Sequence, residues 1–235
     1  MHAYGFSTGA IAPGDVERGL SMLRDHAVDA VELSALRDFE LLTLMSAAPS
    51  LDLARFRYVS VHAPSKLDGM SERECAKLLE PCIQYGWHVV LHPDAIEDPA
   101  CWDSFGETLC IENMDKRKRD GRTVEELAPW FERFPAARFC LDLAHAQQVD
   151  PSMLLTSQLI ETYRDRLVQL HLSELNSESR HRPLSLGMVD LLQRFAHRLP
   201  PVAVVLESQV RESEIGLELT LARRALDVRV SAGAN

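Results

Sequence analysis

The sequence predicts a single-domain (β/α)₈ barrel whose active site lies at the C-terminal face of the barrel. Eight short apolar runs alternate with amphipathic stretches along the 235 residues. The runs are nearly continuous in Val, Ile, Leu and Ala, as is typical of parallel strands covered by helices. Six of these runs end in a residue that can bind a metal ion. Together these features predict one domain over residues 1–235.

The predicted strands are short and evenly spread along the chain. They are Ala3–Ser7, Ala30–Ser34, Tyr58–His62, His88–His92, Leu109–Glu112, Arg138–Asp142, Val168–His171 and Val202–Glu207. Eight such units also suit an open doubly wound sheet. The segment after the first run, FSTGAIAPG, lacks a Gly-rich phosphate loop, and the polar residues at the run ends favour the barrel.

Helix start signals occur between the runs. Ser71 with Glu74 and Thr123 with Glu126 predict capping boxes, and Asp150 before Pro151 predicts a helix start. The segment 93–106 is short, which indicates a stunted or partly 3₁₀ helix. The predicted helices span residues 15–25, 36–47, 71–85, 123–133, 151–165, 186–198 and 211–226.

Composition and charge narrow the class of function. The net charge of −10 opposes binding to a nucleic-acid backbone, so we expect a small-molecule substrate and no nucleic-acid partner. No apolar run approaches the roughly 20 residues that cross a bilayer, and the start of the chain does not resemble a secretory signal. We expect a cytoplasmic protein without a membrane partner. The five scattered cysteines predict neither disulfides nor a thiolate zinc site.

Ionisable residues at the ends of the runs predict a metal site. In a barrel their side chains converge at the C-terminal face, where a buried carboxylate or imidazole is costly unless paired or metal-bound. The six are His62, His92, Glu112, Asp142, His171 and Glu207. His145 and His181 follow on the loops after the sixth and seventh runs. Histidine and carboxylate ligands without cysteine suit Zn²⁺, Mn²⁺ or Fe²⁺.

A single strand-end histidine is more often a structural residue than a ligand, but a set of eight such residues at one face favours a metal site. The remaining histidines belong to no cluster, so we expect packing or surface roles for them. They are His2, His26, His88 and His197.

Several short motifs resemble one known superfamily. They are VSVHAPS, VVLHPDA, LCIENMD, FCLDLAHA, LVQLHLSE, SRHRPL and VVLES. Their order and strand-end placement resemble the xylose-isomerase-like TIM barrels, which include sugar isomerases and epimerases and AP endonucleases of the endonuclease IV type. The resemblance runs from Tyr4 to about Glu207.

The resemblance to the epimerases implies one metal ion, held by residues that match Glu112, Asp142, His171 and Glu207. The two glutamates then also form the acid/base pair that moves a proton next to the substrate carbonyl. His145 matches a residue that contacts the substrate or a further metal, so it joins the two glutamates as a candidate catalytic residue.

The resemblance to the endonucleases implies three metal ions. The first takes positions matching His62, His92 and a bridging Glu112, and the second takes the same four residues as in the epimerases.

The third metal of the endonucleases takes His145, His181 and an aspartate two residues before His181. Ser179 stands at that position here, which places the third ion in doubt, although Glu178 or Glu174 can be considered as a substitute. A third branch with a similar pattern comprises multinuclear iron enzymes that oxidise cysteines in small peptides.

From these alternatives we expect a divalent-metal-dependent isomerase or epimerase acting on a small sugar or polyol, with two or three ions. A multimetal phosphoesterase is the first alternative, because His62 and His92 favour more than one metal. A peptide oxidase and a non-catalytic metal-binding barrel stay open. Short loops and acidic charge oppose DNA repair, which needs loop mass to flip a nucleotide.

Basic residues near the predicted site are candidates for gripping a phosphate or carboxylate of the substrate. Lys116 and Arg117 belong to the basic run after Glu112, and Arg180 and Arg182 flank His181. Glu32 lies in the second run; it is expected to point to the same mouth and to support a ligating histidine or to pair with an arginine.

Overall fold

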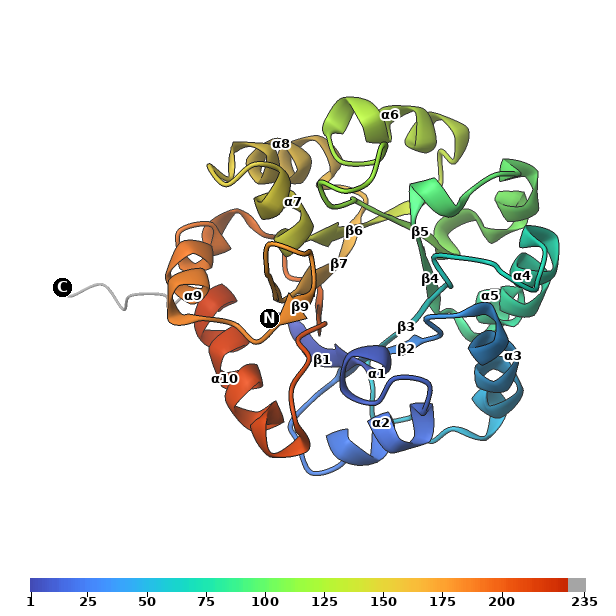
Figure 1. Cartoon of the computed structure of the whole chain (residues 1–235), viewed down its shortest axis with the longest axis horizontal. Coiled ribbons are helices and arrows are strands. Elements are labelled where there is room, and N and C mark those ends of the chain that lie inside the picture. The colour runs from blue at the N-terminus through green and yellow to red at the C-terminus, as the bar shows by residue number, and fades with distance from the viewer. Residues whose placement is uncertain (228–235) are drawn as a thin grey trace.

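Eight parallel strands close into a barrel in the computed structural model, which describes residues 1–227 (Figure 1). The (β/α)₈ fold is confirmed; residues 228–235 of the predicted domain lie outside the described residues. Going round the barrel, the strands are β1 (Ala3–Ser7), β2 (Ala30–Ser34), β3 (Tyr58–His62), β4 (His88–Leu91), β5 (Leu109–Glu112), β6 (Arg138–Asp142), β7 (Leu167–Leu172) and β10 (Ala203–Leu206), which returns to β1.

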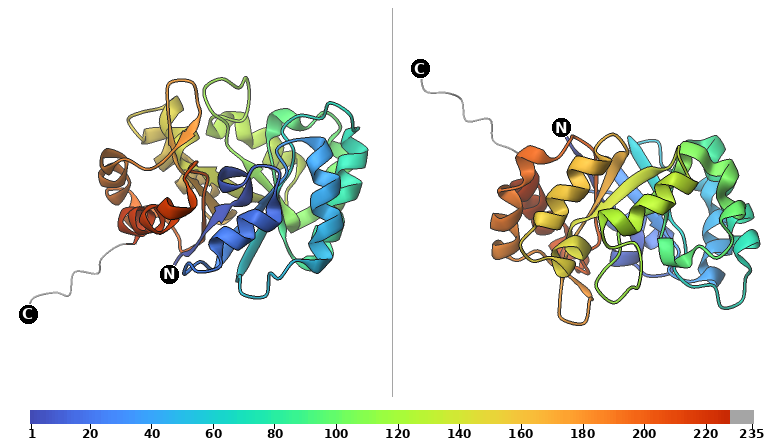
Figure 2. Two further views of the ribbon diagram at one scale, coloured as in Figure 1. Left: turned by 60° about the horizontal axis from the view of Figure 1, so that its bottom comes forward. Right: turned by 90° about the horizontal axis from the view of Figure 1, so that it is seen from above.

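Helices ring the barrel on its outside (Figures 1 and 2). Their apolar faces and the outward side chains of the strands form one large core. The helices are α1 (Thr8–Ile11), α2 (Val16–Leu23), α3 (Asp38–Ala47), α4 (Glu72–Leu79), α5 (Pro81–Tyr85), α6 (Val124–Arg133), α7 (Leu143–Val149), α8 (Leu154–Tyr163), α9 (Leu186–Gln193) and α10 (Ile215–Leu226). None of these helices within residues 1–227 is long and apolar enough to cross a membrane.

Short 3₁₀ segments account for several differences from the predicted helices. The segment after β4 is 3₁₀ over Pro93–Ala95 and Pro99–Thr108, as expected for so short a connection. The predicted helix 186–198 ends at Gln193 and resumes as a 3₁₀ turn at Ala196–Arg198. Further 3₁₀ turns are Ala48–Ser50 and Glu212–Glu214.

The predicted caps have mixed outcomes. The Ser71–Glu74 capping box is confirmed. Thr123 accepts the backbone N–H of Glu126, but the Glu126 carboxylate accepts from the N–H of Arg122 at 2.7 Å, so only half of that box forms.

The helix start predicted at Asp150–Pro151 is wrong. The Asp150 carboxylate instead accepts the backbone N–H groups of Ser152 at 3.0 Å and Leu155 at 2.8 Å, which holds a turn there. Met153 is left-handed with φ of 64°, and α8 begins only at Leu154. The preceding segment forms α7, a helix that the apolar periodicity did not predict.

A two-stranded hairpin after β7 rises beside the barrel mouth, and sequence patterns did not predict it. It pairs β8 (Glu174–Leu175) with β9 (His181–Arg182). The loop after β5 projects from the same face of the molecule (Figure 2). Arg117 Nη1 donates to the Glu178 carbonyl at 3.2 Å, which ties this loop to the hairpin. These two segments therefore form one wall of the mouth.

The barrel interior is partly polar. Val90, Cys110 and Cys140 form a small apolar cluster inside the barrel, separate from the outer core. Beside it, Glu32 and Gln169 are fully buried and joined by a hydrogen bond of 2.7 Å. The residues at the strand ends thus rest on a layer that is rich in hydrogen-bonding groups.

Candidate metal centre

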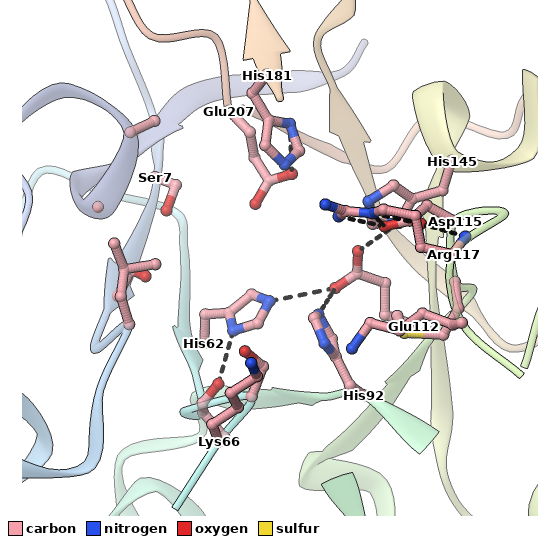
Figure 3. Close-up of a pocket in the computed structure, with 18 of the residues that line it drawn as sticks. Ser7, His62, Lys66, His92, Glu112, Asp115, Arg117, His145, His181 and Glu207 are labelled. Carbon is pink, nitrogen blue, oxygen red and sulfur yellow. Dashed lines mark hydrogen bonds and ion pairs between the residues drawn. The ribbon is translucent and has the colours of Figure 1, made fainter. Parts of the chain in front are cut away.

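The six strand-end residues predicted as ligands meet at the C-terminal mouth of the barrel. His62, Glu112 and Asp142 end their strands, His171 stands one residue before the end of β7, and His92 and Glu207 directly follow β4 and β10. Figure 3 shows four of these residues, with His145 and His181, around one cavity.

Glu112 is the hub of the cluster, and its two oxygens face different partners. Its Oε2 lies 3.2 Å from His62 Nε2 and 3.3 Å from His92 Nε2. Its Oε1 lies 3.3 Å from both His145 Nδ1 and His171 Nδ1. A carboxylate in this position is able to bridge two metal ions.

Two ligand groups follow from this arrangement, and both include Glu112. Their donor atoms lie within 4.8 Å of one another. The histidine pair group is His62, His92 and Glu112; the carboxylate group is Glu112, Asp142, His171 and Glu207. Two further sets overlap with these groups. One joins His62 to His171 and Glu207, and the other joins Glu112 and His171 to Cys140, whose thiol pKa is raised by burial.

Buried polar atoms test whether these residues fit a metal. Among the described residues, four buried side-chain atoms have no hydrogen-bond partner: Glu32 Oε1, His92 Nδ1, Asp142 Oδ2 and His171 Nδ1. Such an atom costs roughly 1–3 kcal/mol when nothing compensates it. Two of them belong to the carboxylate group, so a divalent cation there would supply the missing partner. The residues fit a metal.

Local structure aims Asp142 at this group. Its side chain caps α7, where one oxygen accepts the N–H of His145 at 2.6 Å. Asn113 clamps the Asp142 backbone through its amide, accepting from N–H at 2.8 Å and donating to the carbonyl at 3.0 Å. The other carboxylate oxygen is left free to face His171 and Glu207.

The two glutamates have different electrostatic surroundings. Burial by itself raises the pKa of Glu112, but the imidazoles of His171 and His92 outweigh it and hold that pKa well below its usual range. At Glu207 burial prevails over His171 and His181, and its pKa is raised. At His62 the hydrogen bond to Glu112 and the charges of Glu32 and Glu112 together outweigh burial and raise the pKa to about 9.

No third ligand group forms around His145 and His181 in the part of the chain that the structure describes. The Ser179 hydroxyl donates to Gln148 Oε1 at 2.7 Å. Neither candidate substitute points into the mouth. Glu178 pairs with Arg180 at 3.1 Å on the exposed rim, and Glu174 accepts the N–H of Ser185 at 2.9 Å.

His145 and His181 nevertheless lie beside the cluster, with ring centroids 5.9 Å apart. His181 Nδ1 is 2.8 Å from the Ser173 hydroxyl and 3.6 Å from Glu207 Oε2. Both histidines face the cavity.

A cavity of about 530 Å³ lies above the cluster (Figure 3). Among the residues predicted to bind the substrate, Arg117 lines it, held by Asp115 at 2.7 Å. Lys66 and Lys118 line it as well, and Lys118 pairs with Asp94 at 2.5 Å. Lys116, Arg180 and Arg182 are not among the lining residues.

Sequence reasoning missed the layer beneath the ligands. Ser60, Cys140 and Gln169 each stand two residues before a strand-end residue, so they face the same interior. The period of two along a strand is the signal that would have found them. His88, outside any cluster as expected, stacks on Tyr58 with centroids 5.4 Å apart.

One family model and several solved structures are similar to this chain. The model of the xylose isomerase-like TIM barrel family matches residues 98–209. The predicted resemblance to xylose isomerase-like TIM barrels is confirmed. The matched segment carries six of the eight proposed ligands, namely Glu112, Asp142, His145, His171, His181 and Glu207. No curated protein matches the sequence.

Several solved structures align with nearly the whole chain. Endonuclease IV from Thermus thermophilus is 21 % identical with a TM-score of 0.63, covering 96 % of this chain and 99 % of that one. The 3-keto-D-glucoside 4-epimerase from E. coli is 13 % identical with a TM-score of 0.62, covering 95 % and 99 %. D-psicose 3-epimerase from Clostridium cellulolyticum is 16 % identical with a TM-score of 0.53, covering 96 % of each chain. At these identities the similarity shows the fold.

Proposed function

We propose that this protein is a divalent-metal-dependent enzyme of the isomerase or epimerase type that acts on a small sugar or polyol. The observation that carries the proposal is the carboxylate group of Glu112, Asp142, His171 and Glu207, with its unpartnered oxygen and nitrogen, at the floor of a cavity. A cavity of about 530 Å³ suits a sugar-sized molecule.

The chain's own residues divide the work of such a reaction. A divalent ion bound by this group would polarise the carbonyl and hydroxyl oxygens of the substrate. Glu207 lines the cavity, and we assign it to take a proton from the carbon next to the carbonyl. Glu112 is the candidate to return a proton, and His145 and His181 face the cavity where they are able to donate hydrogen bonds to substrate hydroxyls.

Two metal ions that share Glu112 fit the two ligand groups better than three, because Ser179 and its neighbouring glutamates point elsewhere. The ligand set of imidazoles and carboxylates suits Zn²⁺, Mn²⁺ or Fe²⁺. Lys66 and Arg117 on the cavity wall are the candidates to contact an anionic group on the substrate.

Proton exchange tests the isomerase proposal even while the substrate is unidentified. The metal-loaded protein is incubated in D₂O with a panel of ketoses, aldoses and their phosphates, and deuterium incorporation is followed by NMR. We expect exchange at a carbon next to the carbonyl in at least one sugar, and its loss in Glu207→Gln. The absence of exchange across the panel by a metal-loaded protein would contradict the proposal.

A phosphoesterase is the second candidate, and the histidine pair group favours it. His62 and His92 add a second ligand group next to the first, and paired metal ions are suited to stabilising both oxygens of a phosphoester displacement. Endonuclease IV is among the similar structures. Hydrolysis of a phosphodiester or of abasic-site DNA at a useful rate, with no sugar exchange, would favour this candidate.

A further inference from the structure

Glu32 is a buried carboxylate that the proposed reaction does not use. It lies on β2 with no exposed surface, and the strand order places β1 and β10 between β2 and β7. Its side chain nevertheless reaches His171 on β7, where Glu32 Oε2 lies 3.0 Å from His171 Nε2. The contact therefore crosses the interior of the barrel beneath the metal centre.

Three donor groups converge on this one oxygen. Besides His171, Gln169 Nε2 donates at 2.7 Å and the Ser60 hydroxyl at 3.2 Å. Gln169 is itself held by the hydroxyl of Tyr58, which donates to its Oε1 at 2.8 Å. Among the described residues, His171 is the only ion-pair partner of Glu32. A buried charge is retained only where it is paired, so the imidazole and the carboxylate support each other.

The opposite nitrogen of the same ring faces the ligand group. His171 Nδ1 lies 3.3 Å from Glu112 Oε1 and 3.6 Å from Glu207 Oε2, and it has no hydrogen-bond partner within residues 1–227. The two nitrogens thus have different tasks: one meets a carboxylate outside the ligand groups, and the other lies among the ligands. A neutral imidazole carries one proton, and the hydrogen bond at one nitrogen decides which nitrogen is free to bind a metal.

We propose that Glu32 is a positioning residue of the metal centre, which holds the proton of His171 on Nε2 and so presents Nδ1 as the ligating atom. This inference rests on the proposed metal centre. The alternative is that Gln169 Nε2, which also lies 2.7 Å from His171 Nε2, donates to that nitrogen. The proton would then sit on Nδ1, which could not bind a metal. Glu32 opposes this state, because its Oε2 would then face the lone pair of His171 Nε2 instead of an N–H donor.

NMR of the zinc-loaded wild-type protein tests the proton position directly. Long-range ¹H–¹⁵N spectra of ¹⁵N-histidine protein distinguish a protonated nitrogen from a metal-bound one, and His171→Asn assigns the His171 signals. We expect His171 to be protonated at Nε2 and metal-bound at Nδ1. A proton on Nδ1, or a metal on Nε2, would overturn the inference. This measurement needs no variant of Glu32.

Metal affinity tests the contribution of the carboxylate. Glu32→Gln keeps the shape of the side chain and removes its charge, and should weaken zinc binding at the carboxylate group by roughly 10- to 100-fold in competition with a chelator. Asp38→Asn is the matched control, because Asp38 is also a buried carboxylate but accepts only backbone N–H groups, from Phe39, Asp68 and Gly69. It should leave zinc binding unchanged.

Thermal unfolding of each variant checks that it is folded before the titration. Equal zinc affinity of folded Glu32→Gln and wild type would overturn the positioning role, whereas a wild type that binds no zinc would contradict the metal centre itself. The two failures are therefore distinguishable. Should Glu32→Gln not fold, the wild-type NMR result decides.

Discussion

Both ends of the barrel are rich in polar groups, but the two ends differ in how far these groups are hydrogen-bonded within the protein. At the N-terminal end a cavity is lined by Arg55, Arg57 and Arg223, among others. Arg55 donates to the carbonyls of Arg24 at 2.8 Å and His26 at 2.7 Å, and Arg57 Nε donates to Asp29 at 2.8 Å.

At the C-terminal mouth several buried polar atoms lack a hydrogen-bond partner among the described residues. The four buried side-chain atoms without a partner among residues 1–227 all lie in or beneath the mouth, on Glu32, His92, Asp142 and His171. The difference teaches where each kind of polar group contributes. At the lower end, hydrogen bonds within the protein satisfy the polar groups and stabilise the barrel. At the mouth, the unpartnered polar atoms are available to a ligand.

Replacing the hub of the mouth should have the largest effect. Glu112→Gln keeps the shape of the side chain but removes the charge that both ligand groups share. We expect the affinity for both ions to fall by more than about 100-fold, with turnover lost at the same time. Metal analysis after dialysis measures the loss. A variant that keeps both ions would contradict the role of Glu112 as a ligand shared by the two groups.

Replacing Glu207 should separate catalysis from metal binding. Glu207→Gln removes a base while Glu112, Asp142 and His171 still hold the ion, so metal content should fall less than turnover. Turnover should decrease by roughly 10²- to 10⁴-fold, as for loss of a general base. Steady-state kinetics on the substrate found by proton exchange, with metal content measured on the same sample, checks this. Near-wild-type turnover with full metal would remove Glu207 from the mechanism.

The lower part of the barrel should respond to acid through His88, with an effect on stability and none on metal binding. Burial lowers the pKa of His88 to about 4. Between pH 6.5 and about 4 the unfolded chain therefore binds a proton that the folded chain does not. The contribution of His88 to stability is complete above pH 6.5 and should decrease by about 1–3 kcal/mol as the pH falls through this window.

His88→Phe keeps an aromatic ring against Tyr58 and removes the titration. Its unfolding free energy, measured in urea from pH 7 to pH 4, should depend less on pH than that of wild type. Parallel curves for the two proteins would contradict the role of His88.

The smallest expected effect concerns nucleic acid. With a net charge of −10, the protein should not bind duplex DNA in a salt-sensitive manner near physiological ionic strength. Fluorescence anisotropy of a labelled duplex at two salt concentrations measures this. Binding that weakens steeply with salt would mean that the mouth presents a basic face despite the overall charge.

The sequence predicted the barrel well because its signals are local. Each strand needed only a short apolar run, and the predicted and observed bounds of β3, β5 and β6 coincide. Helix starts were harder to predict. Asp150 carries the right residue type for a cap, but its side chain closes a turn with Ser152 and Leu155 instead. One carboxylate serves either geometry, and the tertiary contacts of α7 and α8 decide between them.

The candidate site also contains positions that the sequence predicted and contacts that it did not. The strand-end positions of His62 and Glu112 are visible in the sequence, and the barrel brings them within 3.2 Å. The contact between Glu32 and His171 joins residues 139 positions apart, and the sequence indicated only that Glu32 would support a histidine or pair with an arginine. The turning of Ser179 toward Gln148 depends on the β8–β9 hairpin, whose strands are only two residues long, too short to show an apolar alternation in the sequence.

Metal analysis of the purified protein tests the central claim most directly. The protein is prepared without chelator or nickel resin, and its metal content is measured by inductively coupled plasma mass spectrometry. The two ligand groups that share Glu112 predict at least two equivalents of Zn, Mn or Fe per chain. A protein that remains metal-free, and takes up no ion when these metals are added in excess, would contradict the account.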